Sequence, residues 1–157
     1  MEEFVIVPYD ARLVANYFLQ LGQSQGAPIS PLKMQKLVYL AHGWNLALRG
    51  QPLISNSIQA WRYGPVVPEL YQDFKKYRAS GIEEAAPVQG SLDDDSKALI
   101  AAVWNRYGHY SGIQLSTLTH EKGYAWDVAS KMGDPFFTPN IPDSLIADEF
   151  QRRRQQG

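Results

Sequence analysis

Hydrophobic residues recur at helical spacing in several stretches of the chain, and short polar or proline-containing segments separate them. Asp10 can cap a first helix that runs to about Leu21, because an aspartate side chain accepts the free N–H groups of a first turn. Ser30 followed by Pro31 predicts the start of a second helix, which runs to about Leu48. The pattern is typical of a mostly α-helical protein.

Later segments show the same periodicity. We expect a third helix at about 66–78, a fourth from the aspartates at 93–95 to about 107, a fifth at about 113–120, a turn or two near Trp126 and a last helix at about 144–153. Residues 52–63 lack this periodicity and predict a small hairpin or extended arm, and the glycines and proline of 79–91 predict a mobile loop. We therefore expect a compact single domain, 1–157, of about six helices with one minor extended element.

The second helix divides into an apolar and a polar side. At 100° per residue the apolar side, which predicts the core, carries Met34, Leu37, Ala41, Trp44 and Leu48; the opposite side, which we expect to face water, carries Gln35, His42, Asn45 and Arg49. Lys33 projects near Leu40 on the apolar side, where a lysine must extend to solvent, find a carboxylate or face a partner. Both a structural and a binding role remain open for it, and we expect Lys36 at the rim of the same surface.

Residues 61–71 hold two prolines, one glycine and three large aromatic side chains. Gly64 can adopt a positive φ, and Pro65 suits the first position of a helix. In one interpretation the aromatic rings fill the core and the turn only shapes the chain. In the other, a rigid loop presents a recognition surface, because aromatic and arginine side chains dominate binding hot spots. Both interpretations hold if Trp61 points inward and Tyr63, Val66 and Pro68 point partly outward.

Composition limits the classes of function that the chain can have. Of its 157 residues 45% are hydrophobic and 20% charged, and the formal net charge of −1 gives no bulk attraction to DNA or anionic membranes. The absence of cysteine excludes disulfides, thiol nucleophiles and the usual structural zinc sites. The acidic first residues precede no long apolar run, and no stretch reaches the length of a membrane span. We expect a cytoplasmic protein without a membrane partner.

No motif predicts catalysis or a bound cofactor. The three histidines are far apart, so no pair has the spacing of a helical metal site, and the chain has neither a Gly-x-Ser-x-Gly elbow nor a phosphate-binding glycine loop. His120 could act as a base for Ser111 or Ser116. Alternatively it closes a helix end by hydrogen bonding near Trp126, which is the interpretation we favour. We expect no catalytic residue, no metal, no cofactor and no enzymatic activity.

Four segments carry a resemblance to a known family. They are Leu-Lys-Met-Gln-Lys-Leu-Val-Tyr-Leu-Ala at 32–41, Gly-Gln-Pro-Leu at 50–53, the aromatic segment at 61–71, and Leu-Thr-His-Glu at 118–121 with a tryptophan six residues after the histidine. In this order and spacing the chain resembles, over about 9–130, the Panacea domain of SocA-like and phage-associated GepA-like proteins. The family usually has Pro-Trp after its Thr-His, whereas Ala125-Trp126 stands here, so the last segment matches more loosely.

The resemblance implies an antitoxin of a type II-like toxin–antitoxin pair. Members are mostly such antitoxins, often on mobile elements or prophages, and one acts as an adaptor that delivers its toxin to a protease. The expected partners are therefore a toxin encoded nearby, bound by direct protein contact, and, in the adaptor variant, a host protease. One patch on the second helix and the aromatic segment is expected to bind the partner, and it comprises Lys33, Gln35, Lys36, Tyr63, Gly64, Pro65, Val66 and Pro68.

Two clusters of charge have alternative explanations. The aspartates at 93–95 suit the N-terminal dipole of a helix, and could also meet a basic toxin surface. The arginines at 152–154 suit a helix C-terminus, and could also contact phosphates. The second possibility motivates the alternative function, a DNA-binding regulatory protein of a mobile element. The balanced net charge argues against nucleic acid as a partner.

Overall fold

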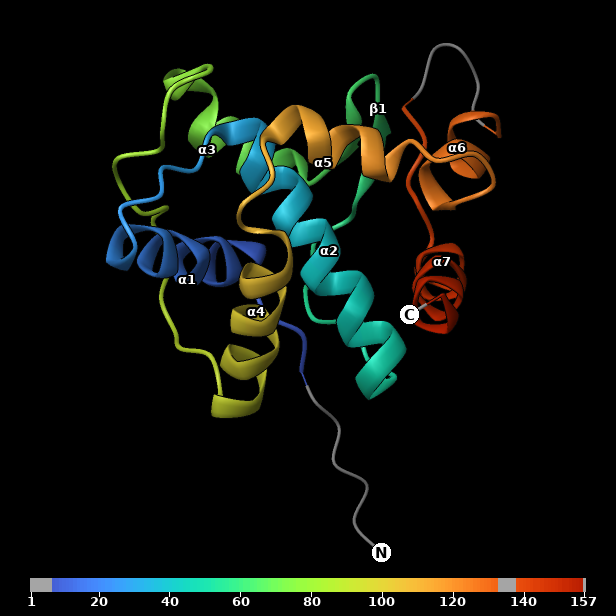
Figure 1. Ribbon diagram of the computed structural model, residues 1–157, viewed down its shortest axis with the longest axis horizontal. Coiled ribbons are helices and arrows are strands. Elements are labelled where there is room, and N and C mark those ends of the chain that lie inside the picture. The colour runs from blue at the N-terminus through green and yellow to red at the C-terminus, as the bar shows by residue number, and fades with distance from the viewer. Residues whose placement is uncertain (1–6, 133–137, 157) are drawn as a thin grey trace, which may run out of the picture.

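Helix α2 (Pro31–Arg49) forms the centre of the protein, and the other helices pack around it (Figure 1). The computed structural model describes residues 7–132 and 138–156. In this part of the chain, α2 packs against α1 (Ala11–Ser24), α3 (Pro68–Phe74), α4 (Asp94–Tyr107), α5 (Gly112–Thr119) and α7 (Asp143–Gln155). Helix α6 (Ala125–Ser130) packs against α7. The predicted compact, mostly helical fold is confirmed.

Three predicted helix starts are confirmed by the hydrogen bonds of their caps. The side chain of Asp10 accepts a hydrogen bond from the backbone N–H of Arg12, and that of Ser30 accepts one from Lys33. Asp93 caps α4 in the same way, through the N–H of Ser96, and this bond lowers the pKa of Asp93. These caps explain why the boundaries of the helices can be read from the sequence.

The hairpin predicted near 52–63 is present, with its second strand slightly further along the chain. It consists of β1 (Gln59–Trp61) and β2 (Gly64–Val66). Helix α3 begins at Pro68 and is followed by a 3₁₀ turn (Lys75–Tyr77). Pro68 occupies the first turn of this helix, whereas Pro65 lies in β2, so the helical role assigned to Pro65 is wrong. The turn or two predicted near Trp126 is the short helix α6.

The polar side of α2 does not face water, and this expectation was wrong. Gln35, His42 and Asn45 are all buried, because helices and loops surround α2 on nearly every side. Each has a hydrogen-bond partner, as buried polar groups require: His42 Nε2 lies 2.8 Å from Asp143 Oδ1, and Asn45 donates to the carbonyl of Gln51. The polar residues of α2 therefore hold neighbouring segments in place.

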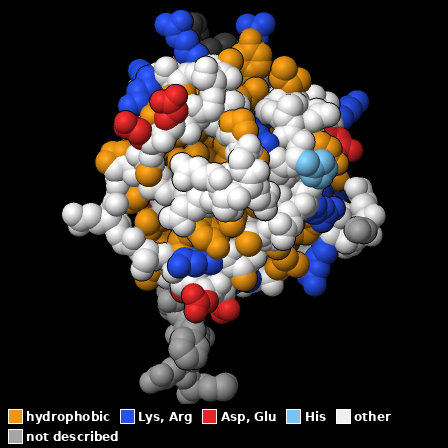
Figure 2. All heavy atoms as spheres, turned by 60° about the vertical axis from the view of Figure 1, so that its left-hand side comes forward, with side chains coloured by type: hydrophobic (Ala, Val, Ile, Leu, Met, Phe, Trp, Pro, Cys, Tyr) orange, Lys and Arg blue, Asp and Glu red, His pale blue; other side chains and the backbone are white. Residues whose placement is uncertain are grey.

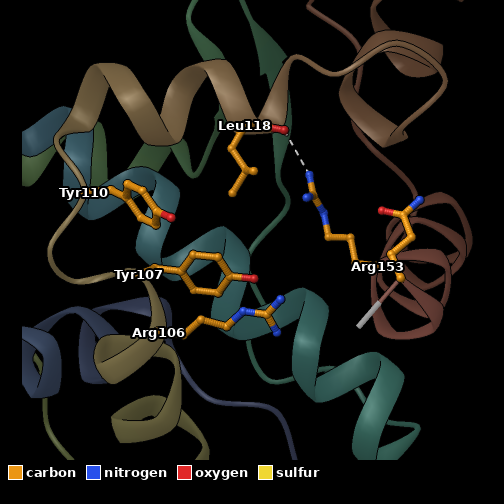
Figure 3. Close-up of a pocket in the computed structure, with 6 residues that line it drawn as sticks. Arg106, Tyr107, Tyr110, Leu118 and Arg153 are labelled. Atoms are coloured by element: carbon orange, nitrogen blue, oxygen red, sulfur yellow. Dashed lines mark hydrogen bonds between the residues drawn. The ribbon is translucent and has the colours of Figure 1, made fainter.

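The arginines at 152–154 belong mostly to the interior contacts of α7. Arg153 is buried, pairs with the fully buried Glu149 at 2.8 Å and donates to the carbonyl of Leu118 (Figure 3). Arg152 is half-buried, donates to the carbonyl of Gly123 and pairs with Asp148 at 3.2 Å, while Arg154 is exposed. The cluster that motivated a DNA-binding function is therefore not a free basic surface. Figure 2 brings forward the left-hand side of Figure 1, away from α7; there, charged side chains of both signs lie mostly toward the edge, and apolar side chains surround a polar centre.

The segment 79–91 has no regular secondary structure, as predicted, but its backbone is anchored. The N–H of Ile82 donates to the carbonyl of Ile29, and Asn16 bonds to both backbone groups of Ala86. Ile82 and Ala86 are buried. In the described residues, no helix has the length and apolar character needed to cross a membrane.

Candidate functional site: the hairpin groove

The turn of the hairpin requires the glycine at its end. Trp61 pairs with Gly64 across the two strands, which leaves Arg62 and Tyr63 as a two-residue turn. Gly64 has φ of +115°, a conformation that side-chain-bearing residues rarely adopt, and a Cβ there would lie 2.8 Å from Cε of Lys36. The predicted positive φ of Gly64 is confirmed, and the same glycine also lets the hairpin approach α2 closely.

Two side chains of α2 hold the hairpin and the segment after it. Gln35 bonds to both backbone groups of Val67, at 3.1 Å to its carbonyl and 2.8 Å from its N–H. Lys36 Nζ donates to the carbonyl of Pro65 at 2.9 Å. Lys36 is fully buried, and this burial lowers its pKa to about 7. These side chains lie underneath the hairpin and position it.

Helices α5 and α6 hold the turn from the other side. Ser116 Oγ donates to the carbonyl of Tyr63 at 2.6 Å, and His120 Nε2 lies 3.1 Å from the carbonyl of Arg62. Trp126 Nε1 donates to the carbonyl of Trp61 at 2.7 Å, and its ring packs on His120 with 4.0 Å between centroids. His120 Nδ1 faces the backbone carbonyl of Ser116 and not a serine hydroxyl. His120 therefore closes the end of α5 near Trp126, as we favoured.

The fixed hairpin forms one wall of a groove that α3 and the start of α2 complete. We call it the hairpin groove; it has a volume of about 490 Å³ and is lined by Pro31, Leu32, Gln35, Lys36, Trp61, Arg62, Tyr63, Val66, Tyr71, Lys75 and Arg78. Tyr63 is 63% exposed and Tyr71 42% exposed, and the Trp61 ring packs edge-on against Tyr71 at 4.9 Å. Its lining residues include three exposed cations, Arg62, Lys75 and Arg78, and no carboxylate. The groove therefore offers aromatic surface in a positively charged setting.

Only some of the predicted partner-binding residues face this groove as expected. Tyr63 points outward as predicted, whereas Val66 is buried and Pro68 half-buried. The expectation that Lys36 forms a rim is wrong, because the hairpin covers its amine. Lys33 lies elsewhere: its Nζ donates to the carbonyl of Gly108 and lies 5.3 Å from the Trp104 ring centroid. This contact agrees with the structural role for Lys33, and its predicted binding role stays a prediction.

Trp61 is half-buried at the groove and not part of the core, so the expected inward position is also wrong. Tyr71, Lys75 and Arg78, which line the opposite wall, are not among the predicted partner-binding residues. Tyr71 and Lys75 are four residues apart, a spacing that places two side chains on the same side of a helix and that the sequence shows. Arg78 lies beyond the helix with a φ of +53°, a position that helical spacing does not predict.

The described residues form no metal site at the hairpin. Among them, no group of three or more histidine, aspartate or glutamate side chains is placed to hold a metal ion. The hydrogen bonds that hold the turn run from side chains to its backbone carbonyls. The geometry is that of a turn fixed in one shape with an exposed tyrosine at its tip.

Comparison with known proteins agrees with the resemblance seen in the sequence. The family described as "Antitoxin SocA-like, Panacea domain" matches residues 34–127, which include most of α2, the hairpin, α3, α4, α5 and the start of α6. The chain is 36% identical to Antitoxin SocA of Caulobacter vibrioides, and the match covers 90% of this chain and 82% of that protein. No solved structure matches the chain.

Proposed function

The chain belongs to the SocA-like antitoxin family with a Panacea domain, and from this premise we propose that it neutralises a cognate toxin by binding it in the hairpin groove. Neutralisation in this proposal is direct protein contact in the cytoplasm, without catalysis. The toxin is encoded beside the antitoxin gene. The observation that carries the proposal is the exposed Tyr63 on a turn that side chains of α2, α5 and α6 hold from below.

The anchored turn has the properties of a binding hot spot. Hot spots are enriched in tyrosine, tryptophan and arginine, and they lose little conformational entropy on binding when the free surface is already rigid. Trp61, Arg62 and Tyr63 supply these residue types within one turn. Lys75 and Arg78 on the opposite wall add positive charge, which favours a toxin segment with acidic side chains.

Co-expression tests the proposal directly. The antitoxin and the product of the neighbouring gene are expressed together; growth should be rescued, and the two proteins should co-purify at a fixed ratio. In a purified assay, protection should require an amount of antitoxin comparable to that of the toxin. Protection by far smaller amounts, together with turnover of a substrate, would instead indicate an enzyme and overturn the proposal.

The same experiment separates simple inhibition from proteolytic delivery. If binding alone neutralises the toxin, rescue persists in a host that lacks its regulatory proteases, and the toxin accumulates in the complex. If the protein is an adaptor, rescue disappears in that host, although the two proteins still co-purify. Both outcomes require the hairpin groove to bind the toxin, so the Tyr63→Ala variant should lose rescue in either case.

A further inference from the structure

A second groove lies at the other end of α2, between this helix and α4. We call it the α2–α4 groove; it has a volume of about 540 Å³ and is lined by Trp44, Leu48, Arg49, Ala98, Leu99, Ala102, Val103, Arg106, Tyr107 and Arg154. None of these residues lines the hairpin groove. The proposed function therefore does not account for it.

The floor of this groove is apolar and open. Leu48, which the sequence assigned to the core, is 55% exposed here. Ala98 and Ala102 are exposed one turn apart on α4, with Leu99 between them. Alanine at these two positions leaves room for another backbone to approach α4 closely. The lining residues of α4 span 98–107, which is about 14 Å of helix and matches two to three turns of a bound helix.

The rim of the groove is positively charged. Arg49, Arg106 and Arg154 come from three different helices, and the lining residues include no carboxylate. The Arg106 guanidinium lies 5.1 Å from the Trp44 ring centroid and 5.2 Å from that of Tyr107, which keeps it beside the apolar floor. Arg49 donates to Asn45 and Ser96.

A smaller depression of about 290 Å³ adjoins this groove, and the Arg153 guanidinium on its far side is already paired with Glu149. Figure 3 shows Arg106 and Tyr107 on one side of it and Arg153 of α7 on the other. Arg106 and Tyr107 line both hollows, so the two adjoin. The combined surface is apolar where Leu48 and Leu99 line it and carries guanidinium groups toward α7.

We propose that the α2–α4 groove binds an amphipathic helix of a partner protein that carries acidic side chains along its edges. The apolar side of such a helix covers Leu48 and Leu99, and its carboxylates meet the guanidinium groups of the rim. Along α2, Lys36 of the hairpin groove and Trp44 of this groove are eight residues apart, which is about 12 Å of helix. This proposal is independent of the toxin-binding role, and both grooves can be filled in one molecule.

A peptide-display selection on the full-length protein tests the proposal. The probe is a library of 16-residue peptides with leucine or phenylalanine at helical spacing and with acidic, basic or neutral residues randomised at the flanking positions. The selected peptides should be enriched in aspartate and glutamate. Their affinity should fall steeply with added salt, as expected for charges at a rim.

Two matched pairs of variants locate the bound peptide. Ala102→Glu places a larger, negative side chain in the groove and should weaken binding at least about tenfold, whereas Asn105→Glu, exposed on the same helix outside the groove, should change it less than about twofold. Arg154→Gln should weaken binding by about threefold to tenfold, as loss of one rim charge predicts. Lys122→Gln, which removes an exposed charge outside the groove, should leave peptide binding unchanged.

Three outcomes would overturn the proposal. The selection could yield no binders, or binders without a preference for acidic residues. The binders could retain their affinity for Ala102→Glu, which would place them elsewhere. Finally, vesicles containing phosphatidylglycerol could bind the parent protein but not Ala102→Glu, while no peptide binds the groove. This result would identify a membrane surface as the occupant.

Discussion

The two ends of α2 form surfaces of similar chemistry by different means. At the N-terminal end, the hairpin groove depends on a short β-hairpin that α2, α5 and α6 hold by hydrogen bonds to its backbone carbonyls. At the C-terminal end, the α2–α4 groove is formed by the outer faces of regular helices. Both combine apolar side chains with arginine or lysine.

This difference predicts how each end responds to substitution. A side chain that bonds to the hairpin backbone acts on the shape of the whole turn, so its loss should reduce both stability and toxin binding. A side chain on the outer face of α4 affects only its own contacts with a bound partner, so its loss should leave the stability of the fold nearly unchanged. The hairpin groove should therefore be the sensitive site and the α2–α4 groove the tolerant one.

The largest effect should come from Gly64→Ala. The added Cβ meets a positive φ and lies 2.8 Å from Cε of Lys36 and 3.0 Å from Oγ1 of Thr119, so we expect a loss of about 3 kcal/mol in the free energy of unfolding. Gly50→Ala is the matched control, because its φ is +68° but no atom lies within 4 Å. It should lose only about 1 kcal/mol in urea denaturation. Equal losses for the two variants would show that the close approach to α2 has no energetic importance.

The next largest effect should come from Gln35→Ala. This variant leaves the N–H and carbonyl of Val67 without their partners in a buried position, so we expect a loss of about 2 kcal/mol in the free energy of unfolding. Gln72→Ala removes an exposed glutamine from α3 and should change stability by less than about 0.5 kcal/mol. If the two variants were equally stable, the anchoring role of α2 would be refuted.

A smaller, pH-dependent effect should come from Lys36. Its pKa falls from 10.5 in the unfolded chain to about 7 in the folded protein, so between these values the unfolded state binds more protons and stability rises with pH. The contribution is complete above pH 10.5 and is lost as pH falls to about 7. Lys36→Met should remove a slope of about 1 kcal/mol per pH unit between pH 7.5 and 9.5.

Urea denaturation at several pH values measures this slope as the difference between the parent protein and the variant. Lys122→Met, which replaces an exposed lysine, is the control and should leave the pH dependence of stability unchanged. An identical slope for the parent and Lys36→Met would show that the Lys36 amine keeps its proton, and hence its hydration, in the folded state.

The smallest effect should come from the α2–α4 groove. Ala102→Glu exchanges one good helix former for another at an exposed position, so the free energy of unfolding should change by less than about 0.5 kcal/mol. Thermal denaturation monitored by circular dichroism provides the measurement. A loss as large as that of Gln35→Ala would remove the proposed contrast between the two ends of α2.

The sequence predicted features that depend on local chemistry. The caps Asp10, Ser30 and Asp93 bond only to the first turn of their own helix, so their effect can be recognised without knowledge of the fold. The mostly helical class and the positive φ of Gly64 follow from equally local signals. The family resemblance added the antitoxin role, which no residue pattern alone could supply.

The sequence did not predict features that depend on the number of neighbours around an element. The polar side of α2 resembles an ordinary solvent-facing side, but packing on nearly every side buries Gln35 and His42 and makes them structural. For the same reason Lys36 lies under the hairpin and Trp61 lies at a groove. Tertiary contacts decide these positions, and helical periodicity gives no information about them.

The claim that the hairpin groove binds the toxin is tested most directly by one measurement, the dissociation constant of the purified complex for Tyr63→Ala. Because the Tyr63 side chain is 63% exposed, the melting temperature of the variant should match that of the parent protein. Its affinity for the toxin should fall at least about 30-fold, or about 2 kcal/mol. Ile113→Ala, which truncates a side chain that is 74% exposed outside the groove, should bind like the parent. Unchanged affinity for Tyr63→Ala would contradict the account and leave the hairpin as scaffold only.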